Sequence, residues 1–103
     1  MTSVSKVLRA VDFGDGRRGF MYWCPACDGA HRVCTEGGEP RWTFNGNVDR
    51  PTFGPSVKVT GGARGSDHVC HHFVEDGIIR YCSDSTHALA GQSIDMPPHE
   101  IGA

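Results

Sequence analysis

No stretch of the 103-residue sequence approaches the roughly 20 consecutive apolar residues that a membrane-spanning helix needs. The first residues also lack the apolar segment of about 7–15 residues that marks a secretory signal peptide. The chain also has little net charge, because its ten Lys and Arg nearly balance its twelve Asp and Glu, which gives a net charge of −2. A strong electrostatic attraction to nucleic acid is therefore not expected. These absences favour a cytoplasmic protein without membrane contact.

A composition that favours long helices is also missing, since the chain contains 14 Gly and 6 Pro. Both residues favour turns and short strands. The length fits one small zinc-binding domain over residues 1–103, with a frayed tail from about residue 97. Residues 85–91 are the best helical segment, because Gly91 is placed to end a helix there. We therefore predict a mostly β fold, a small α+β domain of antiparallel hairpins with this one short helix.

The five cysteines are an odd number, and without a secretion signal they argue against a closed disulfide framework. Cys24-Pro25-Ala26-Cys27 instead predicts half of a zinc-ribbon-like site, because two thiolates on a tight turn can bind one tetrahedral ion. A thioredoxin-like redox pair is less favoured, since Asp28-Gly29 follows where that motif would open a helix. One zinc ion would also stabilise so small a core.

A hairpin is predicted later in the chain. Asp76-Gly77 separates two β-prone runs, residues 69–75 and 78–81, and an Asp-Gly pair between such runs is a strong two-residue hairpin signal. Because side chains alternate along a strand, neighbouring residues of each run point to opposite faces of the hairpin.

This alternation leaves two ligand pairs open for the other half of the metal site. One is Cys70 with a residue just past the hairpin, such as His87. The other is His71 with Cys82, on the opposite face. His31, four residues after Cys27, is a further candidate for the fourth ligand.

Several strings form a joint pattern over about residues 20–97. They are Cys24-Pro25-x-Cys27, Trp42-x-Phe44-Asn45-Gly46-Asn47, Arg50-Pro51-Thr52-Phe53-x-Pro55-Ser56, Cys70-His71-x-Phe73, Asp76-Gly77-x-Ile79 and Asp84-Ser85-Thr86-His87-Ala88-Leu89-Ala90-Gly91-Gln92. The pattern resembles a family of small phage and prophage proteins of unknown function, whose members are sometimes labelled ammonia monooxygenase. That label does not fit a chain without a membrane span, because ammonia monooxygenase is a membrane-embedded copper enzyme.

The resemblance implies phage origin, a setting in the bacterial host cytoplasm and metal binding. Its pattern gives more weight to six residues than to Cys82; they are Cys24, Cys27, Cys70, His71, Asp84 and His87. This favours Cys24, Cys27, Cys70 and His87 as the ligands of one zinc ion. His71 and Asp84 are then neighbours of the site, where they orient a ligand or contact a bound partner.

We expect a non-catalytic, zinc-stabilised module that binds a host or phage macromolecule, for example to inhibit a host defence system. A closed four-ligand zinc site is structural, and Trp23 and Trp42 could anchor an interface with a protein partner rather than nucleic acid. No residue is assigned a catalytic role in this interpretation. The alternative is a metal-dependent hydrolase with an open zinc site and Asp84 or His71 as its base. The HExxH motif and the His-x-Glu motif of the zinc deaminases are both missing from the sequence.

Overall fold

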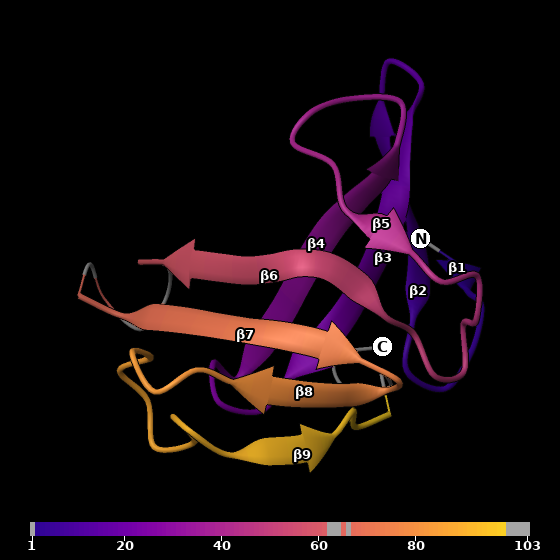
Figure 1. Ribbon diagram of the computed structural model, residues 1–103. Coiled ribbons are helices and arrows are strands. Elements are labelled where there is room, and N and C mark those ends of the chain that lie inside the picture. Colours follow the sequence, from indigo (N-terminus) through magenta and orange to yellow (C-terminus); the bar gives the residue numbers. More distant parts are fainter. Residues whose placement is uncertain (1, 62–64, 66, 99–103) are drawn as a thin grey trace.

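The computed structural model describes residues 2–61, 65 and 67–98, whose strands form two antiparallel sheets (Figure 1). The first sheet has the order β1-β2-β3-β4. Its strands are β1 (Thr2–Ser3), β2 (Arg9–Gly14), β3 (Arg17–Cys24) and β4 (Gly29–Glu36). The second sheet has the order β5-β6-β7-β8-β9. Its strands are β5 (Thr43–Phe44), β6 (Phe53–Thr60), β7 (Val69–Glu75), β8 (Ile78–Tyr81) and β9 (Ser93–Asp95).

The two sheets pack face to face, and strands β6 to β9 cross steeply in front of β2 to β4 (Figure 1). Strands β7 and β8 bury alternate residues between the sheets, as a two-layer fold requires. The buried apolar cluster between them consists of Leu8, Tyr22, Cys24, Val33, Phe53, Val57, Cys70, Val74, Ile79, Tyr81 and Met96. Two of these residues are cysteines from different sheets, so the metal-binding candidates lie in the core.

The predicted β7–β8 hairpin is confirmed. Glu75 pairs with Ile78, and the turn between them has positive φ at Asp76 (49°) and Gly77 (74°). A two-residue hairpin turn of this type requires positive φ at both central residues. The register therefore sends alternate side chains of β7 to the core and to the outer face, as the sequence predicts.

The predicted α+β class is wrong, although the expectation of a mostly β chain is right: no described residue is helical. Residues 85–91 form an irregular segment that ends in a turn at 88–91, because their backbone groups bind neighbouring strands. Thr86 N–H donates to the Val69 carbonyl (2.9 Å), and Gly91 N–H donates to the Tyr81 carbonyl (3.1 Å). These partners replace the carbonyls four residues earlier that a helix would use.

Two further predictions concern the chain as a whole. The described part of the chain contains no candidate membrane-spanning helix. Most of the tail predicted from about residue 97 lies outside the described residues, which end at 98.

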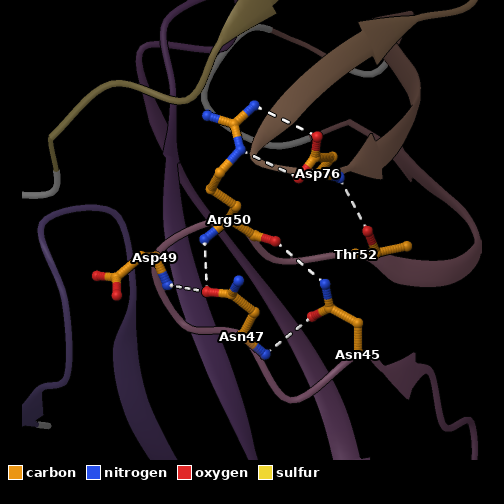
Figure 2. A network of polar contacts seen from close by, with 6 residues as sticks. All are labelled: Asn45, Asn47, Asp49, Arg50, Thr52 and Asp76. Carbon is orange, nitrogen blue, oxygen red and sulfur yellow. Dashed lines mark hydrogen bonds and ion pairs between the residues drawn. The ribbon is translucent and has the colours of Figure 1, made fainter.

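The loop before β6 is fastened to the β7–β8 turn by a network of polar contacts (Figure 2). The Asn47 side-chain oxygen accepts the Arg50 N–H (3.1 Å), and the Asn45 amide donates to the Arg50 carbonyl (3.1 Å). Arg50 Nε donates to Asp76 (3.0 Å), whose own N–H donates to the Thr52 hydroxyl (2.8 Å). The network fixes where β6 begins relative to the hairpin.

Candidate active site and metal centre

Three polar side chains are linked in series on the outer face of the second sheet. The Ser56 Oγ lies 3.0 Å from His71 Nε2. The other ring nitrogen of His71, Nδ1, lies 3.0 and 3.1 Å from the two carboxylate oxygens of Asp84. Because a carboxylate can only accept, Nδ1 carries the hydrogen and Nε2 is free to accept the serine proton. Hydroxyl, imidazole and carboxylate are therefore arranged so that they could serve as a nucleophile, a base and a group that orients the base.

An irregularity in β6 brings Ser56 to this position. The pairing of β6 with β7 jumps from Phe53↔Val74 to Val57↔His72, so β6 carries two extra residues in this interval. Such bulges redirect side chains and are frequent beside active sites. The Ser56 carbonyl is also held, since it accepts a hydrogen bond from Trp42 Nε1 (3.2 Å).

The backbone of His71 is held on its other side by the turn that follows β8. The Ser85 hydroxyl accepts the His71 N–H (3.0 Å) and donates to the His71 carbonyl (2.9 Å). Cys82 N–H donates to the same carbonyl (2.8 Å). Asp84 lies within this turn, so the contacts that fix the strand also bring its carboxylate to the His71 ring.

The three linked side chains are accessible from solvent. The side chain of His71 is 25% exposed and that of Asp84 56% exposed. Phe73, two residues along β7, is an exposed aromatic whose ring centroid lies 6.4 Å from that of His71. Loss of hydration and the nearby Asp84 charge raise the pKa of Cys82, so its thiol is neutral beside the triad. A substrate could therefore approach Ser56 without any opening of the core.

A second group of polar side chains lies on the inner face of β7. Three thiols and one imidazole approach each other with all ligand atoms within 4.8 Å; they are Cys24, Cys27, His31 and Cys70. The tight turn between β3 and β4 supplies the first two, since Cys27 N–H donates to the Cys24 carbonyl (3.2 Å). His31 comes from β4 and Cys70 from β7. These four residues could hold a metal ion, as the Cys24-x-x-Cys27 spacing predicts.

Two observations fit this group to a metal. The sulfur atoms of Cys24 and Cys70 are 4.0 Å apart, close to the roughly 3.8 Å between thiolates bound tetrahedrally at about 2.3 Å from zinc. His31 is 6% exposed, and its buried Nε2 makes no hydrogen bond to any described residue. A buried nitrogen without a partner is costly unless something binds its lone pair.

The protonation states of the Cys24 and Cys70 thiols also fit a metal site. A hydrogen bond with Cys70 lowers the pKa of Cys24 to about 3, and burial opposes this change. The same bond, together with burial, raises the pKa of Cys70. One thiolate is thus stabilised by its neighbour's thiol, and a divalent cation would stabilise both sulfurs as thiolates.

Each of the three sulfur atoms also has a polar neighbour outside the ligand group. Cys27 Sγ lies 3.1 Å from His68 Nε2, and Cys24 Sγ lies 3.1 Å from the Tyr81 hydroxyl. Burial and the bond to Cys24 raise the pKa of Tyr81, so its phenol keeps the proton that it donates. Such donors orient metal-bound thiolates and stabilise their charge.

His72 performs this role for Cys70. Its Nδ1 lies 3.3 Å from Cys70 Sγ, and its Nε2 lies 2.7 Å from the Tyr22 hydroxyl. Burial lowers the pKa of His72 to about 4, so the ring is neutral at pH 7. Tyr22 donates to Nε2, and Nδ1–H then donates to the sulfur.

The structure brings together three of the four ligands weighted by the sequence pattern, Cys24, Cys27 and Cys70, and places His31 beside them. His87 lies outside this group. Its Nδ1 accepts the Leu89 N–H (3.2 Å), so the neutral ring carries its hydrogen on Nε2. That nitrogen, like His31 Nε2, is buried without a hydrogen-bond partner among the described residues, but it carries a hydrogen and not a free lone pair.

His71 and Asp84, predicted as neighbours of the metal site, lie on the opposite face of β7, where Cys82 joins them. The sequence reasoning missed Ser56 as a functional residue. Its only signal was its place at the end of the Arg50-Pro51-Thr52-Phe53-x-Pro55-Ser56 string.

A serine, a histidine and a carboxylate joined in this way define the active-site arrangement of serine hydrolases. Residues 3–82 match the family described as bacterial ubiquitination-like system serine protease (BubE), and the chain belongs to this family. No curated protein and no solved structure shows a significant match to the chain. The match supports the expected membership in a small family of a bacterial, phage-like or defence-related type, and it shows neither phage origin nor a binding target.

Proposed function

We propose that this protein is a serine protease of a bacterial ubiquitination-like system, with Ser56 as nucleophile, His71 as general base and Asp84 as the residue that orients it. The continuous hydrogen-bonded chain from the Ser56 hydroxyl to the Asp84 carboxylate carries this proposal. The name of the family supports it independently. The substrate is accordingly a protein, in keeping with the protein partner expected from the sequence.

The geometry gives each residue one task. His71 Nε2 takes the Ser56 proton as Oγ attacks the scissile carbonyl carbon, and Asp84 stabilises the imidazolium that forms. His71 then gives the proton to the leaving group, and an acyl-serine remains. Water, deprotonated by the same nitrogen, releases the acyl group and restores the Ser56 hydroxyl.

The metal in this proposal is one structural zinc ion held by Cys24, Cys27, Cys70 and His31. Four protein ligands close a tetrahedral site, and closed sites stabilise folds rather than activate water. The ion would tie the β3–β4 turn of one sheet to β7 of the other. Since His71 follows Cys70 directly on β7, the ion would also hold the strand that carries the base.

This arrangement does not favour the alternative of a metal-dependent hydrolase. In that alternative Asp84 or His71 serves as a base beside an open zinc position. Both side chains lie on the face of β7 opposite to Cys70, which is fully buried. His71 contacts Ser56 through one ring nitrogen and Asp84 through the other instead.

Labelling with a fluorophosphonate probe tests the proposal, because an activated serine displaces fluoride from the probe and forms a stable bond to phosphorus. We expect one label per chain, mapped to Ser56 by peptide mass spectrometry. Ser56→Ala should abolish labelling and lower peptide-bond hydrolysis by about 10⁴- to 10⁶-fold. Ser93→Ala is the matched control, since Ser93 is an exposed serine of the same sheet and should label normally.

Asp84→Asn adds a graded test. Buried triads lose about 10⁴-fold in kcat on this substitution, but Asp84 is 56% exposed and solvent screens its charge. We therefore expect a loss of about 10²- to 10⁴-fold. Undiminished labelling of Ser56→Ala, or a label that maps to another serine, would refute the assignment.

A further inference from the structure

Cys82 places a third side chain that can bind a metal next to His71 and Asp84 on the outer face of the second sheet. It follows β8 directly, and its N–H is bonded to the His71 carbonyl (2.8 Å). Its sulfur, a His71 ring nitrogen and an Asp84 carboxylate oxygen all lie within 4.8 Å of one another. A thiol, an imidazole and a carboxylate are the three side-chain groups that bind zinc in proteins. No step of the hydrolysis derived above uses the thiol.

This group differs from the Cys24 group in its access to solvent. Cys24 and Cys70 are fully buried, whereas Asp84 is 56% and His71 25% exposed. A cation from solution can therefore reach the outer group while the core remains closed. With three protein ligands, a tetrahedral ion there would keep one position for water.

We propose that His71, Cys82 and Asp84 form a regulatory site for a thiol-binding divalent cation, Zn²⁺ or Cd²⁺, whose binding switches the hydrolase off. The inhibition rests on the proposed function, because it acts through the base of the triad. The metal site itself does not depend on that function.

The inhibition follows from the tautomer of His71. In the triad Nδ1 carries the hydrogen and gives it to Asp84, which leaves the Nε2 lone pair for the Ser56 proton. A cation between Nδ1 and Asp84 needs the Nδ1 lone pair, so the ring hydrogen moves to Nε2. The Cys82 thiol releases its proton to solvent as the sulfur binds. Nε2 then donates instead of accepting, and no base remains for Ser56.

The ligand types also set which cations act. Sulfur and imidazole favour zinc and cadmium, whereas Mg²⁺ and Ca²⁺ prefer all-oxygen sites with more ligands. Inhibition by Zn²⁺ that Mg²⁺ does not reproduce would distinguish this site from a general effect of divalent charge on the exposed Asp84.

The test uses the complete protein with its Cys24 group already loaded with zinc, titrated with Cd²⁺ or Zn²⁺. Binding is read from the thiolate-to-cadmium charge-transfer absorption, and inhibition from the rate of fluorophosphonate labelling. We expect one additional equivalent to bind and labelling to stop at saturation, with no effect of Mg²⁺. Cys82→Ser should keep the basal labelling rate, lose the additional absorption and bind the cation at least about tenfold more weakly.

Cys82→Ala provides a second variant, and thermal melting shows whether each variant is folded. Equal inhibition of the wild type and both folded variants would overturn the proposal, and so would additional binding that leaves labelling unchanged. If the cation-free protein does not label at Ser56, the proposed function fails. In that case the charge-transfer absorption still tests the metal site separately. The site requires the additional absorption in the wild type and no such absorption in Cys82→Ser or Cys82→Ala.

Discussion

Replacing His31 with alanine should release the core metal ion, whereas replacing His87 should not. His31 is 6% exposed, its Nε2 has no hydrogen-bond partner among the described residues, and one of its ring nitrogens lies within 4.8 Å of the three thiols. His87 uses Nδ1 to accept the Leu89 N–H (3.2 Å) and packs its ring edge-on against Tyr81, with centroids 4.7 Å apart. The two variants remove the same side chain from neighbouring parts of the structure, so each is a control for the other.

The expected magnitudes differ. A residue that only orients a metal ligand contributes about 10- to 100-fold in affinity, so loss of a ligand should cost at least about 2.7 kcal/mol. A domain of this size loses about 6 °C in Tm per kcal/mol, which gives at least about 16 °C for His31→Ala. His87→Ala removes one hydrogen bond worth about 0.5–1.5 kcal/mol, which gives about 3–9 °C.

Elemental mass spectrometry of the purified variants, with thermal melting of each, measures both quantities. We expect close to one zinc per chain in the wild type and in His87→Ala, and well below that in His31→Ala. Full metal content in His31→Ala together with metal loss in His87→Ala would refute the reasoning and make His87 the fourth ligand. Absence of metal from the wild type would refute the metal centre itself.

Three other outcomes are expected. Removing the metal with a chelator should lower Tm and the rate of Ser56 labelling together, and added zinc should restore both. Ser85→Ala removes both hydrogen bonds to the His71 backbone, so labelling should slow by about tenfold or more while the metal content is unchanged. Gly19→Ala should destabilise the chain by more than about 3 kcal/mol in urea unfolding, because its Cβ would lie 1.8 Å from the Val33 carbonyl oxygen.

Features determined by nearby residues could be predicted from the sequence. The turn from Cys24 to Cys27 and the Asp76-Gly77 hairpin each depend on a few neighbouring residues with strong turn preferences. Alternation along β7 then placed Cys70 and His71 on opposite faces. The sequence alone therefore predicted that Cys70 and His71 belong to two different groups of side chains.

The short helix was mispredicted because its backbone partners are distant in sequence. Residues 85–91 have acceptable helix composition and a terminal Gly91. Thr86 and Gly91 nevertheless donate to carbonyls of β7 and β8. Hydrogen bonds to a neighbouring sheet override weak helix propensity in so short a segment.

Ser56 could not be found in the same way, because it is 15 residues from His71 and 28 from Asp84 in the sequence. Its position depends on the irregular pairing between Phe53 and Val57, which no local pattern specifies. A serine after a proline at the start of a strand is otherwise an ordinary residue. The triad therefore becomes visible only when the register of β6 against β7 is known.

That register links the two candidate sites. Cys70 contributes to the metal group on the inner face of β7, and the next residue, His71, contributes to the triad on the outer face. A shift of one residue in the pairing of β7 would exchange these faces, so it would bury the base and expose the metal ligand. Arg50 and Thr52 both form hydrogen bonds with Asp76 in the β7–β8 turn. These contacts hold β7 in position relative to the segment that leads into β6. Since the core metal would hold β7 at Cys70, metal binding and the geometry of Ser56 and His71 should vary together, although no ligand of the ion belongs to the triad.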